Sequence, residues 1–244
     1  MRNLIGLLLL TLATSCLWGQ QLPSGTLLPV MLDDTINSNK VKPGQEIVAK
    51  LRQDVPLPDN GKIKRLAKVT GHIVAVSRES PGQPASLTLQ FDKVEIEKDV
   101  VTVSTGLRAL ASMQIVAQVR QPVNTNMSPG TSVWDLNLSL IGGQIAYNGA
   151  KIVKAPNGQV VGRVPEPGAT LGVPMANPER GCVGPVGNAE QAFWVFSTDA
   201  CGLYDLKDFT YVSGIGGDAP GKIILKAPKT VEIRGGSAWL LQVN

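Results

Sequence analysis

The chain has 244 residues, of which 43% are hydrophobic and 17% are charged, and its formal net charge is +4. Such a chain can bury a substantial core, which excludes a disordered polypeptide, and its mild positive charge does not favour a nucleic-acid partner. The basic cluster at residues 62–68 (KIKRLAK) is interrupted by apolar residues. We expect this cluster to form a solvated strand face whose apolar side chains turn inward.

The first residues of the chain have the features of a secretory signal. Arg2 supplies a positive charge, and an apolar run extends from Leu4 to Ala13. This run is too short for a membrane-spanning helix, which needs roughly 20 apolar residues. We therefore predict that residues 1–15, or a segment reaching to about residue 20, are removed, and that the mature chain is exported and has no transmembrane helix.

Two interpretations of the cleavage site remain open. Ala13 and Ser15 fit the small residues that a signal peptidase prefers, whereas residues 13–16 (ATSC) resemble a bacterial lipoprotein box. In the second case Cys16 would be lipidated and would provide a lipid anchor. Both interpretations place the protein in the periplasm or at the outer membrane, and both remove Cys16 from the set of free thiols.

Apolar and polar residues alternate with period two through much of the first half of the chain, which predicts antiparallel strands. The expected strands cover residues 45–52, 67–78, 85–96 and 100–105. The apolar face changes near Asp92 and Lys93, which indicates a β-bulge. Residues 97–99 (EKD) are predicted to form the turn of a hairpin, and Gly71 is expected at a bend.

The 26 glycines and 17 prolines mark turns between short strands throughout the chain. This spacing predicts an all-β fold, either a barrel or a sandwich of short antiparallel strands. One exception is residues 107–119 (LRALASMQIVAQV), whose content of Leu, Ala, Met and Gln favours a short helix.

A polar, turn-rich stretch (RQPVNTNMSPGTS) separates two parts of different composition. Residues 22–30 and 233–243 are alike, since each has a small-residue turn that opens an apolar strand. We infer that the last strand returns to the first module. The predicted organisation is a β-barrel module (22–119 and 221–244), a linker (120–132) and an inserted β-rich domain with a disulfide (133–220).

Residues 22–63 (LPSGTLLPVMLDDTINSNKVKPGQEIVAKLRQDVPLPDNGKI) resemble the β-barrel domain of the TrbI-type scaffold subunit of conjugative type IV secretion systems. The shared features are a Pro-x-Gly-Thr entry at residues 23–26, a strand ending at Leu32, and the TINS motif at residues 35–38. The resemblance implies a barrel fold for the first module, in which these residues build walls and no catalytic site. It also implies an envelope location, with envelope proteins or further copies of the chain as partners.

Cys182 and Cys201 are the two cysteines that remain after export. An even number of cysteines in an oxidising compartment favours a disulfide. A redox pair would more often have the Cys-x-x-Cys spacing, whereas eighteen residues separate these two. A zinc site would need carboxylates or His72, the single histidine of the chain. We therefore predict a disulfide and no metal site.

Other motifs do not complete a catalytic or cofactor site. Residues 216–222 (GGDAPGK) have the glycine and lysine spacing of a phosphate-binding loop, but Ile223 stands where Ser or Thr would hold magnesium. The chain has no Gly-x-Ser-x-Gly elbow that would supply a serine nucleophile for His72 to activate, so His72 is predicted to lie on the face of a strand. Asp33 and Asp34 are predicted to lie in a turn after a strand. No catalytic residue, cofactor or metal ligand is therefore assigned.

The aromatic stretch at residues 193–196 (FWVF) lies between the two cysteines. As a strand it would point Trp194 and Phe196 away from the other two side chains. Packing in a core beneath the disulfide is expected, and contact of Trp194 with a ligand or a protein partner is the alternative.

The sequence favours a non-enzymatic, exported cell-envelope protein that acts as a structural or binding module. The alternative is a secreted hydrolase with a carboxylate-based site in the insertion. That alternative requires at least two carboxylates to converge in one cleft and to have raised pKa values. The candidates are Glu166, Glu179, Asp199 and Asp205.

Overall fold

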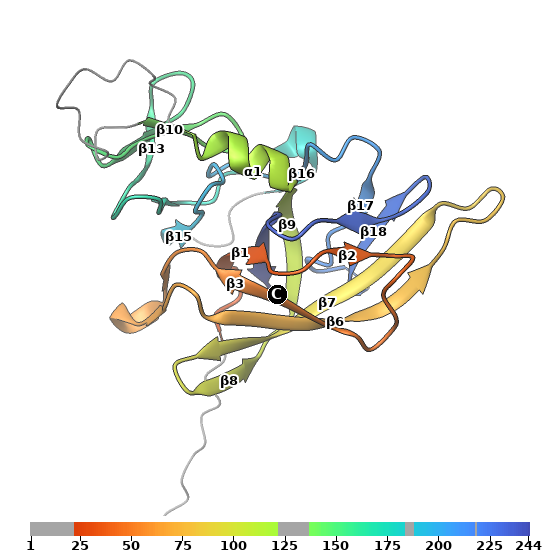
Figure 1. The fold of residues 1–244 in the computed structure, drawn as a ribbon. Coiled ribbons are helices and arrows are strands. Elements are labelled where there is room, and N and C mark those ends of the chain that lie inside the picture. The colour runs from red at the N-terminus through yellow and green to blue at the C-terminus, as the bar shows by residue number, and fades with distance from the viewer. Residues whose placement is uncertain (1–21, 122–136, 184–187, 218) are drawn as a thin grey trace, which may run out of the picture.

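The computed structural model describes residues 22–121, 137–183, 188–217 and 219–244. The predicted signal segment and Cys16 lie outside the described residues, as does most of the predicted linker. The described chain consists mainly of short strands, which confirms the all-β class (Figure 1).

One curled sheet, called the large sheet, forms the centre of the molecule. Its strands are β1 (Leu27–Leu32), β3 (Glu46–Leu51), β6 (Lys68–Ser77), β7 (Ala85–Ile96), β8 (Asp99–Thr102), β9 (Thr105–Ala111), β16 (Gly202–Tyr204), β17 (Thr210–Val212), β18 (Ile223–Ala227) and β20 (Ala238–Val243). Their order is β16-β9-β20-β1-β3-β6-β7-β18-β17, with β8 paired to β7. Only β16 and β9 are parallel, and every other pair is antiparallel.

The large sheet curls into a half-barrel, so that strands distant in its order approach each other. On β9, Leu107 donates its backbone N–H to the backbone oxygen of Ser213, just after β17, at 2.6 Å. Thr105 Oγ1, also on β9, donates to the backbone oxygen of Phe91 on β7 at 2.9 Å. The concave side holds the main core, where the rings of Phe91 and Trp239 meet edge to face with centroids 5.6 Å apart.

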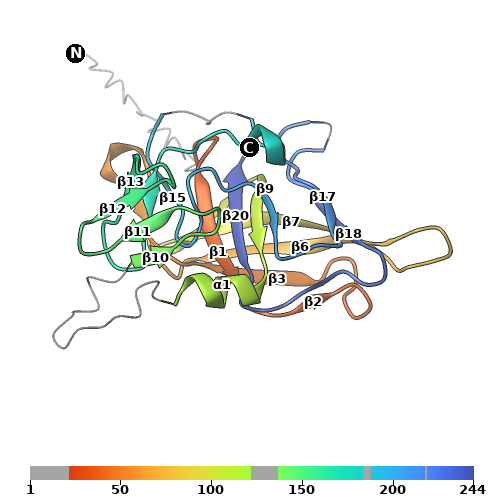
Figure 2. The same cartoon turned by 90° about the horizontal axis from the view of Figure 1, so that it is seen from above.

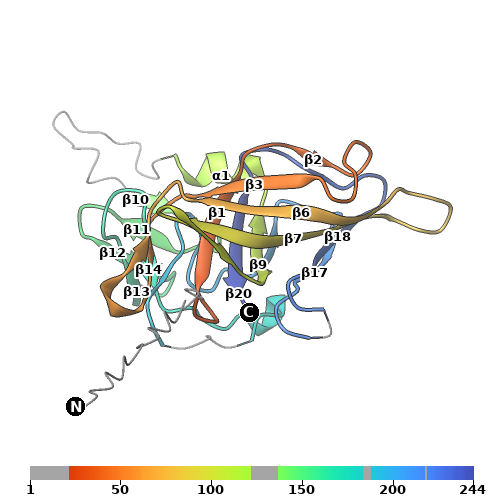
Figure 3. The ribbon, with the colours of Figure 1, turned by 90° about the horizontal axis from the view of Figure 1, so that it is seen from below.

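Strands β6 and β7 form a long hairpin whose alternating sequence explains its burial (Figure 3). Leu87, Leu89 and Phe91 on β7 are fully buried, and the polar residues between them are half-buried. After β7 the chain turns into β8, where Ile96 faces Asp99. The hairpin predicted from the EKD turn is therefore confirmed.

A β-bulge interrupts the pairing of β6 with β7. Thr70 pairs with Lys93, but the next residue, Gly71, pairs with Phe91, so Asp92 is the extra residue on β7. The bulge predicted near Asp92 and Lys93 is confirmed. It lets the apolar side chains on both sides of Asp92 face the same core.

The helix predicted over residues 107–119 is wrong in its first half. Residues Thr105–Ala111 form strand β9, which is fully buried between β20 and β16. Helix α1 covers only Met113–Val119, and the Ser112 side chain caps it by accepting a hydrogen bond from the N–H of Ile115 at 3.3 Å. Burial of β9 on both faces outweighs the helix propensity of its Leu and Ala residues.

A second, smaller sheet, called the inserted sheet, follows the helix in the chain. Its strands are β10 (Asn137–Ser139), β11 (Ile145–Tyr147), β12 (Ile152–Lys154), β13 (Val160–Arg163), β14 (Leu171–Gly172) and β15 (Gln191–Ala192), paired antiparallel in chain order. It lies at the end of the molecule opposite the β6–β7 loop (Figures 2 and 3). The segment expected as an insertion, residues 133–220, is thus divided, because β16 and β17 join the large sheet.

The remaining elements are short and lie in loops. They are β2 (Ile36–Asn37) paired with β19 (Glu232–Ile233), β4 (Val55–Pro56) paired with β5 (Lys62–Ile63), and the 3-10 helices η1 (Pro58–Asn60) and η3 (Pro178–Arg180). The β4–β5 pair follows β3 directly, and Arg65 in the turn after it lines a cavity together with residues of the inserted sheet.

Strands β1, β9 and β20 are covered on both faces. Their second face packs in a separate core in which Leu27, Ala109 and Leu240 meet helix α1 and residues 193–196. The nearly continuous apolar sequences of these strands agree with burial on both sides. This second core joins the large sheet to the chain that follows the inserted sheet.

Replacing Gly71 by alanine is expected to destabilise the large sheet, because the backbones of β6 and β7 approach closely at the bulge. A Cβ on Gly71 would overlap the backbone oxygen of Gln90 and would lie 2.7 Å from Phe91 Cα. Gly71→Ala should lower the free energy of unfolding, measured by urea denaturation, by about 2–3 kcal/mol.

The matched control is Gly61→Ala. At this position φ is −70°, and the added Cβ would have its nearest neighbour at 3.3 Å. The free energy of unfolding should change by less than about 1 kcal/mol. An equal loss in both variants would contradict the close approach at Gly71.

Candidate functional site

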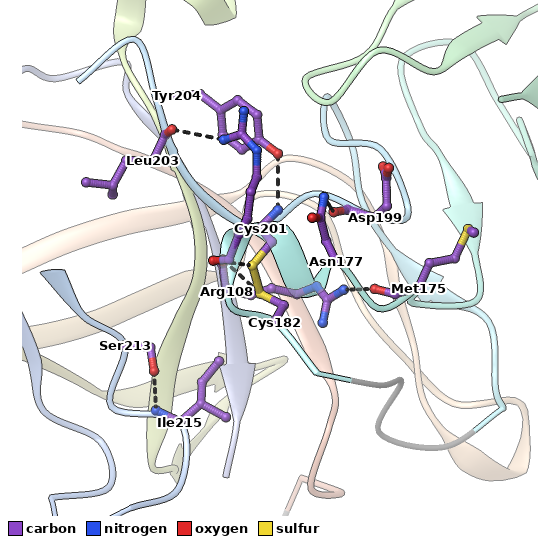
Figure 4. The surroundings of a disulfide bond; sticks show 11 residues. Arg108, Met175, Asn177, Cys182, Asp199, Cys201, Leu203, Tyr204, Ser213 and Ile215 are labelled. Carbon is purple, nitrogen blue, oxygen red and sulfur yellow. Dashed lines mark hydrogen bonds between the residues drawn. A yellow bond between two sulfur atoms is a disulfide. The ribbon is translucent and has the colours of Figure 1, made fainter. Parts of the chain in front are cut away.

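The two cysteines predicted to pair form the disulfide Cys182–Cys201, which confirms the predicted staple (Figure 4). Cys182 follows η3, and Cys201 directly precedes β16, which adds to the large sheet beside β9. The bond therefore fastens the loop between β14 and β15 of the inserted sheet to the edge of the large sheet. With both sulfur atoms bonded to each other, no thiolate is left as a zinc ligand.

Arg108 and Tyr204 lie beside the disulfide (Figure 4), and the backbone oxygen of Arg180 is 3.4 Å from Cys201 Sγ. Arg108 is only 3% exposed, and its Nη2 donates to the backbone oxygen of Met175 at 2.6 Å. Burial lowers the pKa of Arg108 and raises the pKa of Tyr204. The Tyr204 hydroxyl accepts a hydrogen bond from the Cys201 N–H at 3.1 Å, and the Arg180 guanidinium lies 4.4 Å from the centre of its ring. These contacts hold the disulfide loop against β9.

The aromatic stretch does not continue as a strand, so this part of the prediction is wrong. Strand β15 ends at Ala192, and the chain then turns, with Trp194 at a φ of 54° and the Phe196 N–H bonded to the backbone oxygen of Phe193 at 3.0 Å. Because of the turn, both phenylalanines are fully buried and Trp194 is 6% exposed. The expected core packing is therefore present, and Trp194 also lines a cavity.

A buried glutamine, Gln53, holds Trp194 in place from the large sheet. Its Oε1 accepts hydrogen bonds from the backbone N–H groups of Trp194 at 2.6 Å and Thr170 at 3.0 Å. Its Nε2 donates to the backbone oxygen of Thr170 at 3.0 Å. Gln144 Oε1 accepts from the Thr198 N–H, and its Nε2 donates to the Thr198 hydroxyl, both at 2.9 Å. Gln53 thus satisfies backbone groups that a neighbouring strand would otherwise satisfy.

A cavity of about 310 Å³ lies between the large sheet and the inserted sheet. It is lined by Arg52, Arg65, Val119, Arg120, Leu138, Ser139, Leu140, Ala146, Asn148, Pro167, Gly168, Ala169, Thr170, Trp194 and Val195. These residues come from the loop after β3, the turn after β5, the end of α1, the inserted sheet and the turn after β15. We call it the arginine cavity, and its volume suits a small ligand.

Positive charge is concentrated in the arginine cavity. The guanidinium carbon of Arg52 lies 5.6 Å from the centre of the Trp194 ring, a cation–π distance. Burial, followed by the charges of Arg120 and Arg65, lowers the pKa of Arg52, and the charge of Asp33 opposes this effect. None of the described residues that line the cavity is acidic. The three guanidinium groups therefore repel one another without a carboxylate between them.

The four carboxylates of the hydrolase alternative lie in separate environments. Asp199 and Asp205 accept hydrogen bonds from two different serines, at 2.6 and 2.5 Å. Glu166 lines a second cavity, and Glu179 is exposed in η3. In the part of the chain that the structure describes, no three His, Cys, Asp or Glu side chains are grouped so as to hold a metal ion.

The other acidic and histidine candidates have ordinary surface contacts. His72 lies on β6, and its Nδ1 is 3.0 Å from a carboxylate oxygen of Asp92. Asp33 and Asp34 occupy a bend directly after β1, as predicted, and Asp33 pairs with Lys50 at 2.6 Å. Strand β18 begins at Ile223, so a strand follows the glycine-rich motif as expected.

The basic cluster at residues 62–68 forms ion pairs at the surface. Three of its side chains face carboxylates, in the pairs Lys62–Asp54, Lys64–Glu97 and Lys68–Glu95. Ile63 is buried as expected, but Leu66 is 52% exposed because it occupies a turn with φ at 72°. Arg65 is exposed and lines the arginine cavity.

No protein-family model matches this chain, and comparison with curated proteins finds no significant match. Among residues 22–121, 137–183, 188–217 and 219–244, no helix is both long enough and apolar enough to cross a membrane. The functional proposal therefore depends on the chemistry of the site.

Sequence reasoning did not identify Gln53 or the three cavity arginines. Arg52 stands at the end of an expected strand, Arg65 lies in the basic cluster, and Arg120 begins the predicted linker. No periodic pattern links these positions. They meet because the turns after β3 and β5 and the end of α1 all face the inserted sheet.

Replacing Gln53 by methionine is expected to loosen the contact between the two sheets. The variant would leave the backbone groups of Thr170 and Trp194 without their buried hydrogen bonds. Gln53→Met should lower the free energy of unfolding by about 2–4 kcal/mol in chemical denaturation. Gln45→Met, at an exposed glutamine, is the control and should change it by less than about 0.5 kcal/mol. Equal stabilities of the two variants would refute the role of Gln53.

Removing the disulfide in a Cys182→Ala, Cys201→Ala variant should lower the free energy of unfolding by about 3 kcal/mol, because the bond closes a loop with a sequence separation of 19. Denaturation with and without reductant provides the measurement. Reductant should destabilise the natural protein to a similar extent and should leave the variant unchanged. If reductant also destabilised the variant, the loss of stability in reductant would not come from the disulfide.

Proposed function

We propose that this protein is an exported, non-enzymatic module of the cell envelope that acts by binding or by structural assembly. The main supporting observation is the Cys182–Cys201 disulfide, which joins the loop between β14 and β15 to the chain that enters β16 beside β9. Disulfides form and persist in oxidising compartments outside the cytoplasm. The secretory features of residues 1–15 agree with this location.

A binding or scaffold role is supported by the way the two sheets are joined. Buried amides, a shared apolar core and a covalent bond all connect the inserted sheet and its following chain to the half-barrel. Such a rigid connection holds the walls of the arginine cavity in fixed positions, which lowers the entropy lost on binding. The resemblance of residues 22–63 to TrbI-type scaffold domains supports envelope proteins or further copies of the chain as partners.

Export can be tested with the full-length chain carrying a C-terminal tag. The protein should be recovered from the periplasmic or membrane fraction, and Cys182 and Cys201 should react with an alkylating reagent only after reduction. A chain lacking residues 1–20 is the control and should remain in the cytoplasm with reactive thiols. Recovery of the full-length protein in the cytoplasm with reactive thiols would contradict export.

Two further measurements test the anchor and the partners. If Cys16 is lipidated, Cys16→Ser should move the protein from the membrane fraction to the soluble periplasmic fraction, whereas simple cleavage predicts the same soluble fraction for both proteins. Chemical crosslinking in intact cells should give discrete species larger than the monomer. A crosslinked sample that contains only monomer would contradict assembly with envelope partners.

A further inference from the structure

We infer that the arginine cavity binds a small molecule through an oxyanion group, a carboxylate or a phosphate, held by Arg52, Arg65 and Arg120. This inference does not depend on the envelope location, because binding is a property of the folded chain. It begins from the charge of the cavity, because three arginines line it, the charges of Arg120 and Arg65 act on Arg52, and the described lining residues supply no carboxylate.

The side chain of Arg52 has unused hydrogen-bonding capacity at this position. Its Nε is buried and has no hydrogen-bond partner among the described residues. A buried donor without a partner is costly, and an oxyanion in the cavity would accept from it. The planar guanidinium fork matches the two oxygens of a carboxylate or a phosphate. Burial, and after it the charges of Arg120 and Arg65, lower the pKa of Arg52, and a bound anion would counter the effect of these charges.

The position of Arg52 is fixed before any ligand arrives. Its guanidinium is 5.6 Å from the centre of the Trp194 ring, and the Trp194 backbone is hydrogen-bonded to Gln53 at 2.6 Å. The backbone N–H of Arg52 also donates to the backbone oxygen of Pro29 on β1 at 3.0 Å. Arg52 is thus tied to the large sheet through its backbone and to the turn after β15 through its side chain, so little ordering is needed on binding.

The remaining walls define the rest of the ligand. Val119, Leu138, Leu140 and Val195 give the cavity an apolar side. Asn148 places a buried Oδ1 there that has no hydrogen-bond partner among the described residues. A ligand with an oxyanion at one end, an apolar body and a hydroxyl or amino donor would satisfy all of these groups.

Two other cavities lack this combination. Among the described residues, the cavity beside the disulfide is lined by a single arginine, Arg108, whose Nε is also buried without a partner but whose Nη2 already donates to the backbone of Met175. In the cavity beside the β4–β5 pair, Lys62 is paired with Asp54, and Glu166 adds a further negative charge. An anion is therefore best accommodated in the arginine cavity.

Titration calorimetry of the purified chain at low salt tests the inference. The probes are inorganic phosphate, benzoate and the neutral benzoate analogue benzamide. Phosphate or benzoate should bind saturably with one site per chain, and added salt should weaken the binding. Benzamide should bind at least about tenfold more weakly than benzoate, because it carries no negative charge to pair with the guanidinium groups. Preference for one anion identifies the group as phosphate or carboxylate.

Substitutions locate the binding. Arg52→Gln and Arg120→Gln should each weaken anion binding by about tenfold, since each removes one charge-assisted contact. Arg120 is exposed at the end of α1, so Arg120→Gln leaves the fold intact and is the deciding variant. Arg78→Gln removes the same charge from an exposed residue outside the cavity and should have no effect. Absence of saturable binding by both anions, or equal weakening by Arg120→Gln and Arg78→Gln, would overturn the inference.

Discussion

The buried amide of Gln53 is the contact on which the arrangement of the two sheets depends. The inserted sheet has short strands and only a small core of its own, formed by Leu140, Ala146, Val153 and Val164. A sheet of this kind needs a packing partner to be stable. Gln53 supplies the connection through buried hydrogen bonds to three backbone groups of Thr170 and Trp194. Without it those groups would be buried and unpaired.

The aromatic turn at residues 193–196 adds apolar packing next to this polar contact. Once Trp194 is held by Gln53, its neighbours Phe193 and Phe196 cover the outer face of β1, β9 and β20. The same strands face the main core on their other side, so both of their faces are buried. The disulfide then links the chain that leaves this turn, just before β16, to the loop between β14 and β15. The segment from Phe193 to Cys201 is thus held by a polar contact with Gln53, by apolar packing of its aromatic residues and by the disulfide.

Local patterns in the sequence were sufficient for the β7–β8 hairpin and its bulge, because alternation, β-branched residues and turn residues all act over a few positions. They were not sufficient at residues 105–119 or at Trp194. Strand β9 is a strand because two neighbouring strands cover it, and this coverage overrides the propensity of its Leu and Ala residues. Trp194 adopts a positive φ because a distant glutamine binds its backbone. The arginine cavity could likewise not be predicted from local sequence patterns, since its charges come from three separate segments.

The charge of the arginine cavity and the stability of the fold are connected through Trp194. Repulsion among Arg52, Arg65 and Arg120 disfavours the approach of α1 and the turns after β3 and β5, and the contacts of Gln53 and Trp194 offset this cost. An anion that binds the three guanidinium groups replaces repulsion with attraction. By linkage, such a ligand stabilises the folded chain in proportion to its occupancy. A ligand in the cavity therefore stabilises the junction of the two sheets. The fold accommodates the concentrated positive charge at this junction because the neighbouring contacts are buried and strong.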